Sequence, residues 1–407
     1  MMIELSEAQE IVLKSISQLP ATKTPLSGCD GLVSYGAIYA GESIPPFDNT
    51  AVDGFALSFE SVQAGNKEFE IVGTIAAGDP GDIPIGGSTT VRIMTGAPMP
   101  EGADCVLMVE DSVVTEKDGK SFLTFSKRPR EFENVRKAGS DIVQGQLLFP
   151  SNTQLFAGHL GVLASLGISE ITAFPRARVG IISTGSELTD TPGPLQHGQI
   201  RDSNRPMLFS LVKEMGAIPM DLGTIKDDRE SLRDGFLKAA SSCDVLLSSG
   251  GVSVGDFDYT KQILDELSNG TMSWMQIAIR PAKPFAFGHI GSTPVFGLPG
   301  NPVSSAVSFE LLARPAIRKM MGHQKLFRTV VPAVAKTDIH RRADGKIHFV
   351  RVTANLEMNG KIYIDPQSGQ SSHLLYSMAN SNALAIVPDG TGYMAGDEVS
   401  TLILRML

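Results

Sequence analysis

The feature that most constrains the fold of this chain is an alternation of apolar strands and amphipathic helices, which runs from Ala177 to about Met321. The strand candidates are short and almost wholly apolar, as at residues 178–183 and 294–298. Such strands are buried on both faces, which is typical of a doubly wound, mostly parallel sheet covered by helices. Ligands of these sheets bind outside the carboxyl ends of the strands. The loops that follow the strands therefore carry the candidate site.

One of these loops is rich in glycine and serine and has the sequence SSGGVSVG at residues 248–255. Gly250 and Gly251 would let the backbone approach a ligand closely, and Ser253 would add a hydroxyl. Asp256 and Asp258 follow at the start of a helical segment, where each could cap the helix or hold a cation. Taken alone, the loop fits a flexible capped turn as well as a binding site.

Acidic residues occur in three of the loops that share this edge. They are Glu187 after the first strand, Asp227 beside Asp228 after the second, and Asp258 after the third. Either Asp227 or Asp228 could simply be a helix cap. Several carboxylates on one edge repel one another and need a cation or a basic partner. Glycine-rich turns beside helix starts favour an anion, so the combination predicts a phosphorylated substrate bridged by Mg²⁺.

Basic residues come from the segment IAIRPAKPF at residues 277–285. Its prolines interrupt regular structure, so Arg280 and Lys283 are expected to lie together at the same edge rather than as unrelated surface charges. The last loop of the sheet has the sequence GLPGNPVSS at residues 297–305.

Several common classes of protein are disfavoured. The chain has no GxxxxGK[ST] loop, no GxGxxG after a predicted strand and no GxSxG elbow. Its net charge of −9 argues against a general nucleic-acid binder. The three cysteines support neither a disulfide framework nor a zinc site, and the acidic N-terminus and lack of a long apolar run indicate no signal peptide and no membrane span. A reducing cytoplasm fits best.

The residues on either side of the alternating region are predicted to be β-rich. Short strands broken by glycine and proline lie between about residues 69 and 126, and alternation returns after Gly322. The length of 407 residues suggests two to four domains. We expect an N-terminal helical and linker segment (1–44), a barrel-like β domain (45–145), linker helices (146–176), the α/β domain (177–325) and a small C-terminal β domain (326–407).

Within the first β-rich region, three polar features stand out. Asp48, Asn49 and Asp53 lie close together in a proline-punctuated loop, where turn formation explains them as well as function does. Thr95 follows a strand end in a Gly/Pro turn, and Asp141 follows a mixed charged run that local composition alone would assign to a solvated face.

Taken together, these motifs resemble the MoeA family of molybdopterin molybdenumtransferases, which is related to the gephyrin E-domain. The resemblance covers about residues 45–321 and is carried, in order, by PFDNTAVDGF (46–55), RIMTGAP (92–98), STGSE (183–187), SSGGVSVG (248–255), DYT (258–260) and GLPGNPVS (297–304). The glycine-serine loop alone is less specific, because related molybdopterin-binding folds carry similar loops.

The resemblance implies Mg²⁺-dependent insertion of molybdate into adenylylated molybdopterin, with release of AMP. It implies a homodimer whose site is shared between the parallel domain of one subunit and the β-rich domain of the other. It also implies a possible pathway partner, the molybdopterin adenylyltransferase. The net charge and the lack of a long apolar run predict no nucleic-acid or membrane partner.

The site residues that the resemblance implies fall into three groups. The catalytic group is Asp53, Glu187, Asp227, Asp258 and Lys283, and the metal ligands are Asp258 and Glu187. The cofactor-binding group is Thr95, Asp141, Gly250, Gly251, Ser253, Arg280, Pro299, Pro302 and Ser304. Asp53 is expected to orient a water or a metal ligand during release of AMP.

Two positions depart from the pattern of the family. Gln276 stands where some members have Lys, and Ser186 stands where Asp is frequent. Two other functions remain open, an adenylyltransferase that acts on molybdopterin and a non-catalytic molybdopterin-binding scaffold. The long β-rich regions favour the molybdenumtransferase over the adenylyltransferase, for which a bare parallel domain would suffice.

Overall fold

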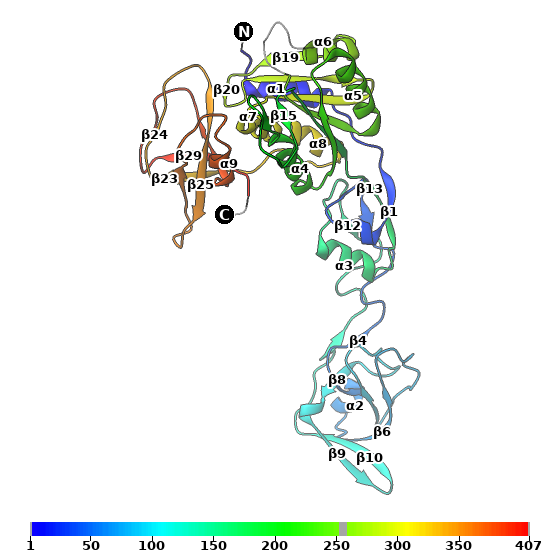
Figure 1. Cartoon of the computed structure of the whole chain (residues 1–407). Coiled ribbons are helices and arrows are strands. Elements are labelled where there is room, and N and C mark those ends of the chain that lie inside the picture. The colour runs from blue at the N-terminus through cyan, green and yellow to red at the C-terminus, as the bar shows by residue number, and fades with distance from the viewer. Residues whose placement is uncertain (1, 252–258, 406–407) are drawn as a thin grey trace. The chain divides into compact units, whose positions relative to one another are not determined.

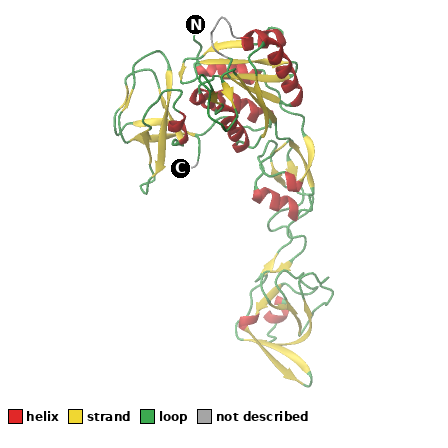
Figure 2. Cartoon of the chain, viewed as in Figure 1, coloured by secondary structure: helices red, strands yellow, loops and turns green. Residues whose placement is uncertain are grey.

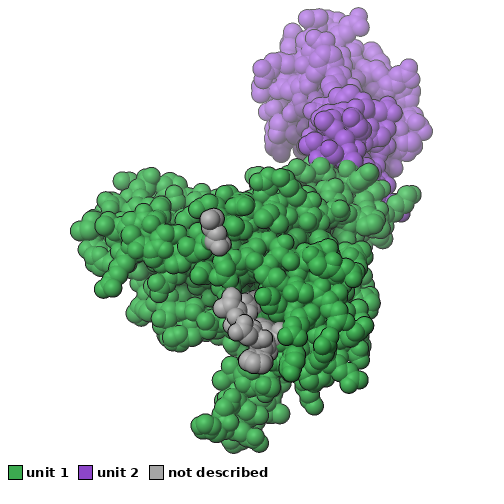
Figure 3. Space-filling view, turned by 90° about the horizontal axis from the view of Figure 1, so that it is seen from above, with its two compact units in different colours: residues 1–35, 152–156, 171–407 green, residues 36–151, 157–170 purple. Residues whose placement is uncertain are grey.

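The computed structural model describes residues 2–251 and 259–405. The chain divides into two compact units (Figure 3). The first contains residues 1–35, 152–156 and 171–407, and the second contains residues 36–151 and 157–170. Figure 1 follows the chain through both units by colour.

The centre of the first unit is a six-stranded sheet in the order β17-β14-β18-β22-β21-β19 (Figure 1). Its parallel strands are β17 (Ile218–Ile225), β14 (Arg178–Thr184), β18 (Val245–Ser249) and β22 (Thr293–Leu298). The antiparallel strands are β21 (Pro284–Ile290) and β19 (Ser273–Gln276). The prediction of a mostly parallel sheet is confirmed, although the sequence did not predict β21.

Helices cover both faces of this sheet because its strands are apolar on both faces. In β18, Leu247 packs into one core and its neighbour Leu246 into the opposite core, as the two-residue period of a strand requires. The first core is covered by α1 (Leu5–Lys14), α4 (Asn204–Glu214), α7 (Pro302–Ser308) and α8 (Arg314–Met320). The second is covered by α5 (Arg229–Ser242) and α6 (Tyr259–Leu267). Figure 2 shows these helices around the strands.

Helices α7 and α8 join through a π-helical turn at Phe309–Ala313, where Glu310 is buried. Its carboxylate accepts hydrogen bonds of 2.9 Å from Nε and Nη2 of Arg328, and Arg314 Nε lies 3.6 Å away. Residues 302–320 thus form one continuous helical segment with an irregular turn in its middle.

A second sheet of the first unit is built from the C-terminal residues. Strands β25 (Ile347–Leu356), β26 (Ile362–Pro366), β23 (Val330–Ala335), β29 (Glu398–Ile403) and β27 (Ala383–Val387) pair in that order, and β27 pairs back with β25. These five strands close into a small barrel around the core that contains Val352, Ile364 and Val399. The two-residue strand β20 (Ile279–Arg280) extends it by pairing in parallel with β25. Helix α9 (Leu375–Ala379) lies between β26 and β27 in sequence.

The second unit contains a six-stranded sheet in the order β8-β5-β7-β6-β10-β9. The strands are β5 (Gly54–Leu57), β6 (Glu68–Ile75), β7 (Thr89–Ile93), β8 (Cys105–Met108), β9 (Ser112–Lys117) and β10 (Lys120–Phe125), with α2 (Phe59–Gln63) following β5. Phe55 and its neighbour Ala56 enter different cores, so this sheet too is buried on both faces. The β-rich prediction for this region is confirmed.

Shorter elements complete both units. The second also holds β3 (Ile38–Tyr39), β4 (Asn49–Thr50), β11 (Val135–Arg136), β12 (Leu147–Phe149) and α3 (Ala157–Ser165). The first adds β1 (Thr22–Pro25), β2 (Val33–Ser34), β13 (Glu170–Phe174), β15 (Leu188–Thr189), β16 (Ile200–Arg201), β24 (Ile339–His340) and β28 (Gly392–Tyr393). Over the described residues, no helix has the length and apolar character needed to cross a bilayer.

Candidate functional site

The glycine-rich loop begins at the carboxyl end of β18, where two glycines are required by close packing. Gly250 has φ +94°, and a Cβ on it would lie 2.7 Å from the carbonyl oxygen of Thr184. Gly251 has φ +69°, and its Cβ would lie 2.3 Å from Cγ2 of Thr260 in α6. The Gly250 N–H donates to the Leu298 carbonyl at 3.1 Å. The loop backbone therefore fits between the ends of β14 and β22 only because these side chains are absent. Ser253, Asp256 and Asp258 lie outside the described residues.

The acidic residues of the neighbouring loops have distinct environments. Glu187 is exposed and folds back over Gly185, whose added Cβ would lie 2.8 Å from both carboxylate oxygens. Asp228 is the cap of α5, because its Oδ1 accepts the Ser231 N–H at 2.9 Å, and this backbone hydrogen bond lowers the pKa of its carboxyl. Asp227, the predicted site residue, is exposed beside it. Glu187 and Asp227 thus follow two directly paired strands, β14 and β17.

Buried polar atoms without partners gather around the same strand ends. Within the described part of the chain, these atoms have no hydrogen-bond partner although they are shielded from solvent. They are the hydroxyls of Ser183, Thr184, Ser248 and Ser305 and the side-chain carbonyl of Asn204. Burying a polar group without a partner costs about 1–3 kcal/mol, so this edge is suited to a polar ligand.

The predicted basic segment lines a cleft of about 510 Å³ that also contains residues from the loop after β22. Arg280, Lys283, Pro299 and Ser304 all contribute to its lining. Pro302 is the first residue of α7, next to this cleft in sequence. Arg280 and Lys283 are exposed, and within the described residues neither forms an ion pair with a carboxylate. Two unpaired cations in one cleft favour an anionic ligand.

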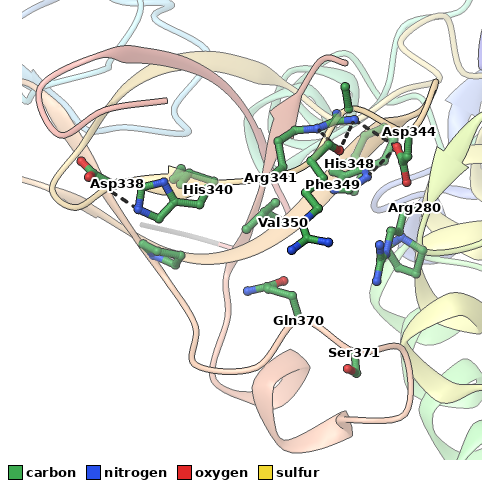
Figure 4. A pocket seen from close by; sticks show the side chains of 15 residues that line it. Arg280, Asp338, His340, Arg341, Asp344, His348, Phe349, Val350, Gln370 and Ser371 are labelled. Atoms are coloured by element: carbon green, nitrogen blue, oxygen red, sulfur yellow. Dashed lines mark hydrogen bonds and ion pairs between the residues drawn. The ribbon is translucent and has the colours of Figure 1, made fainter. Parts of the chain in front are cut away.

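A second cleft, of about 590 Å³, shares Arg280, Gln370 and Ser371 with the first and extends along the C-terminal barrel. Asp344, which lines both clefts, binds Arg341 at 3.0 Å and Lys346 at 3.0 Å. Figure 4 shows Arg341 and His348 turned toward Asp344, with Gln370 and Ser371 across the cleft.

The charges around Asp344 set the protonation states at this wall. Desolvation would raise the pKa of the Asp344 carboxyl, but hydrogen bonds from Lys346 and His348 hold it below its ordinary value. Burial lowers the pKa of His348, which the hydrogen bond to Asp344 opposes. The carboxylate is therefore ionised, and it forms ion pairs with Arg341 and Lys346 at this wall.

Arg351, which the sequence analysis did not identify, lies directly behind the loop shared by the two clefts. Its side chain is completely buried in β25, and its Nη2 donates to the carbonyls of Gly369 at 2.9 Å and Ser371 at 3.2 Å. Nε and Nη1 have no partner in the described part of the chain. Burial lowers the pKa of Arg351 to about 10, so it is still charged at neutral pH. An arginine inside an apolar strand was the available signal, because such a charge is rarely buried without a function or a partner.

The second unit holds its own polar cluster around Asp53. Its Oδ1 accepts hydrogen bonds from the backbone N–H and the hydroxyl of Thr95, each at 2.7 Å, and these lower the pKa of the Asp53 carboxyl. Asp48 accepts from Lys137 at 2.8 Å and from the Ala138 N–H at 2.8 Å. The two carboxylates of the PFDNTAVDGF motif are therefore ionised.

Asp141 and Asn49 belong to the same unit but differ in their contacts. Asp141 donates its backbone N–H to Ile44 at 3.0 Å, and within the described residues its carboxylate has no partner. Asn49 is buried, and its side-chain oxygen has no described partner. The structure thus joins Asp53 to Thr95 directly and shows no contact of either with Asp141 among the described residues.

The described residues contain no group of three His, Cys, Asp or Glu side chains that could hold a metal ion by itself. Of the two predicted metal ligands, Glu187 is described and Asp258 is not. The oxygen chemistry of both suits Mg²⁺.

Comparison with protein families assigns nearly the whole chain. Residues 3–167 match the MoeA N-terminal region (domain I and II), residues 180–319 match a probable molybdopterin-binding domain, and residues 332–404 match the MoeA C-terminal region (domain IV). The two clefts are thus lined by residues from the second and third of these regions.

Individual relatives agree with these matches. The molybdopterin molybdenumtransferase of Haemophilus influenzae is 35% identical over 88% of this chain and 88% of its own length. That of Nostoc sp. is 34% identical over 97% of this chain and 91% of its own. A solved molybdopterin biosynthesis MoeA protein from Pyrococcus horikoshii is 27% identical, covers 100% of both chains and has a TM-score of 0.83. The chain belongs to the molybdopterin molybdenumtransferase family.

Proposed function

We propose that this protein inserts molybdenum from molybdate into molybdopterin, that its substrate is the adenylylated form, and that AMP is released in the reaction. The observation that carries this proposal is the cation-rich cleft. Arg280 and Lys283 are unpaired in its lining, and Arg351 is a buried charge behind its wall. Molybdate is a dianion, and such a cleft stabilises it by charge and by N–H donors.

The pterin substrate would lie along the adjoining edge of the parallel sheet. Gly250 and Gly251 leave its backbone uncovered there, and the hydroxyls of Ser183, Thr184 and Ser248 lack described partners. Ser304, Pro299 and Pro302 would form the side of the site next to molybdate. Ser253 would contribute from the same loop. In this arrangement the two substrates meet where the clefts and the sheet edge adjoin.

We propose that Mg²⁺ assists release of AMP and is held by Glu187 and Asp258, with Asp227 nearby. The ion would neutralise charge on the phosphates. Glu187 suits this role because its carboxylate is exposed and has no ion-pair partner among the described residues. The fold would hold these carboxylates close together at the strand ends. Because like charges repel one another, this arrangement favours the binding of a cation.

We further propose that the protein is a homodimer and that Asp53, Thr95 and Asp141 of one copy complete the site of the other. Asp53 is kept ionised by Thr95 and would orient a water or a metal ligand. The supplier of the substrate would be a molybdopterin adenylyltransferase. A cytoplasmic location is supported by the three cysteines, which are all free and buried.

The test is an incubation of the purified protein with adenylylated molybdopterin, Mg²⁺ and molybdate, in which AMP and molybdenum cofactor are both measured. AMP release that depends on molybdate supports the proposal, and Asp53→Ala should abolish it without preventing substrate binding. Consumption of ATP with plain molybdopterin would instead identify an adenylyltransferase. Binding of molybdopterin without either reaction would identify a scaffold.

A further inference from the structure

Arg205, the second residue of α4, joins three carboxylates. Its Nε donates to Asp202 Oδ2 at 3.1 Å, and its Nη1 contacts both carboxylate oxygens of Asp221 at 2.6 and 2.7 Å. Its Nη2 donates to Asp190 Oδ2. The Arg205 side chain is only 11% exposed, which protects these contacts from solvent more than an ordinary surface ion pair.

Each carboxylate belongs to a different segment of the chain. Asp190 directly follows β15, Asp202 lies between β16 and α4, and Asp221 lies within β17. Asp202 is 2% exposed, and its Oδ1 also accepts the backbone N–H groups of Asn204 and Arg205, both at 3.1 Å. Arg205 therefore fixes the loop between β14 and α4 to the body of the sheet.

Asn204, the residue before Arg205, connects the start of α4 to two loops of the candidate site. Asn204 donates from Nδ2 to the hydroxyl of Ser249 at 2.7 Å and to the carbonyl of Gly300 at 2.8 Å. Ser249 ends β18, and Gly300 lies in the turn before α7. The start of α4 thus has a defined position relative to two loops of the site.

Glu187 belongs to the loop that Arg205 holds. It lies three residues before Asp190, and its carbonyl accepts the Ile200 N–H at 2.9 Å where β15 and β16 pair. Among the described residues, its carboxylate has no ion pair of its own, so its position depends on the loop backbone. We propose that Arg205 is a positioning residue, which holds Glu187 at the sheet edge by binding Asp190, Asp202 and Asp221 together. This inference rests on the proposed function for the role of Glu187, but the contacts of Arg205 do not depend on it.

The geometry of the guanidinium explains why arginine is suited to this position. Its planar fork presents N–H donors in three directions, whereas a lysine ammonium is a compact charge on a flexible stem. Arg205→Lys should keep the charge beside buried Asp202 but cannot reach all three carboxylates in the same geometry. The Arg205→Lys variant should therefore fold, and its loop that carries Glu187 should be partly loosened.

The most informative variant is Asp190→Asn. It removes one of the three ion pairs of Arg205, and because Asp190 is 54% exposed, the change leaves no unpaired charge buried. The matched control is Arg178→Gln. Arg178 binds Asp244 at 2.8 Å, but Arg178 begins β14, at the opposite end from the candidate site. All variants are made in the full chain, and the melting temperature of each is measured.

The first measurement is amide hydrogen exchange of residues 186–201 in the protein without substrates. Asp190→Asn should raise exchange in this segment about tenfold, corresponding to a loss of about 1.4 kcal/mol of local stability. Arg205→Lys should raise it less, and Arg178→Gln should leave it unchanged. Unchanged exchange in both Asp190→Asn and Arg205→Lys would overturn the inference.

The second measurement separates kcat from KM. With Asp190→Asn we expect kcat to fall about tenfold, and with Arg205→Lys by less. In both, the half-saturating Mg²⁺ concentration should rise while KM for molybdate stays within about twofold. Raised exchange with unchanged kcat and Mg²⁺ dependence would overturn the positioning role. If the wild-type protein shows no molybdate-dependent turnover, the proposed function fails, and hydrogen exchange alone then decides whether Arg205 holds the loop of Glu187.

Discussion

Arg351 is a cation that the fold buries without a carboxylate partner among the described residues. Two carbonyls satisfy one of its nitrogens, and the other two nitrogens have no described partner. An isolated charge in a protein interior costs several kcal/mol unless something compensates it. Arg351 lies behind Gln370 and Ser371, which line both clefts, and we propose that an oxyanion bound there supplies this compensation.

We expect Arg351→Met to raise KM for molybdate by about tenfold or more, since a lost charge interaction of about 1.4 kcal/mol corresponds to that factor. Arg351→Lys should raise it less because the charge is kept. Both variants lose the hydrogen bonds to Gly369 and Ser371, so both should have lower stability. Steady-state kinetics with varied molybdate distinguishes the two. Equal KM values for Arg351→Met and Arg351→Lys would show that the charge at this position does not contribute to molybdate binding.

His323 provides a prediction about pH. Burial, followed by the charges of Arg318 and Arg314, lowers its pKa from 6.5 to about 4. Its ring nitrogen Nδ1 lies 3.1 Å from Nη2 of Arg318, which suits a neutral imidazole that accepts this hydrogen bond. Protonation of the ring in the folded protein would place a third positive charge beside the two arginines.

The folded pKa of His323 lies below the unfolded value, so the unfolded chain takes up a proton first as the pH falls. Stability should therefore decrease between about pH 6.5 and pH 4, by roughly 2–3 kcal/mol in total from this group. Urea unfolding at several pH values measures this loss of stability. The transition to analyse is the one in which the first unit, which contains His323, unfolds. His323→Gln should remove most of this slope, whereas His197→Gln, in an exposed loop, should not change it.

At the scale of elements, the edge of the parallel sheet depends on glycines that bring loops into contact. Gly251 combines a left-handed backbone with an approach of 2.3 Å between its added Cβ and Thr260. The clash is with a buried side chain, so relief requires movement of the loop or of α6. The shape of this edge is therefore set by residues that have no side chain of their own.

We expect Gly251→Ala to destabilise the first unit by about 2–4 kcal/mol, the sum of left-handed strain and overpacking. Gly270→Ala is the matched control, because Gly270 has φ +77° but nothing within 4 Å of its added Cβ. Strain alone should cost about 1 kcal/mol there. Urea midpoints of the two variants give the comparison. Similar losses in both would show that the loop near Gly251 relaxes freely.

The elements also show what the sequence could predict. The parallel strands were predicted because they are apolar runs between amphipathic helices. Strand β21 was not predicted, because Pro284 begins it and the preceding prolines resemble a loop. Arg280 and Lys283 were singled out because they lie in a segment that prolines interrupt, and the structure places them in one cleft with Ser304. The contributions of Asp344 and Arg351 depend on the pairing of β20 with β25, a contact between segments far apart in sequence that no local pattern reveals.

At the scale of the whole molecule, the predicted site residues are divided between the two units. Asp53, Thr95 and Asp141 belong to the second, and Glu187, Arg280 and Lys283 belong to the first. Each unit has its own hydrophobic cores. Residues that act together in one reaction but fold in separate units can be supplied by different copies of the chain.

This division gives a complementation test of the proposed shared site. At a molybdate concentration well below KM, Asp53→Ala should be inactive alone and Arg351→Met only weakly active. When equal amounts are unfolded and refolded together, random pairing should restore about a quarter of wild-type activity, since half of the dimers are mixed and each has one intact site. If each site is built within a single copy, the mixture should remain no more active than its components.

The ion pair between buried Glu310 and Arg328 also limits how this protein can be recombined with its relatives. Arg328 lies in the segment between α8 and β23, which would otherwise be a natural crossover point for exchanging C-terminal barrels. A chimera joined before Arg328 takes this arginine from the donor, and a donor without it would leave the Glu310 carboxylate with Arg314 alone, at 3.6 Å. Crossovers placed after Arg328 keep the pair in one parent, so chimeric barrels joined there should fold more often than those joined a few residues earlier.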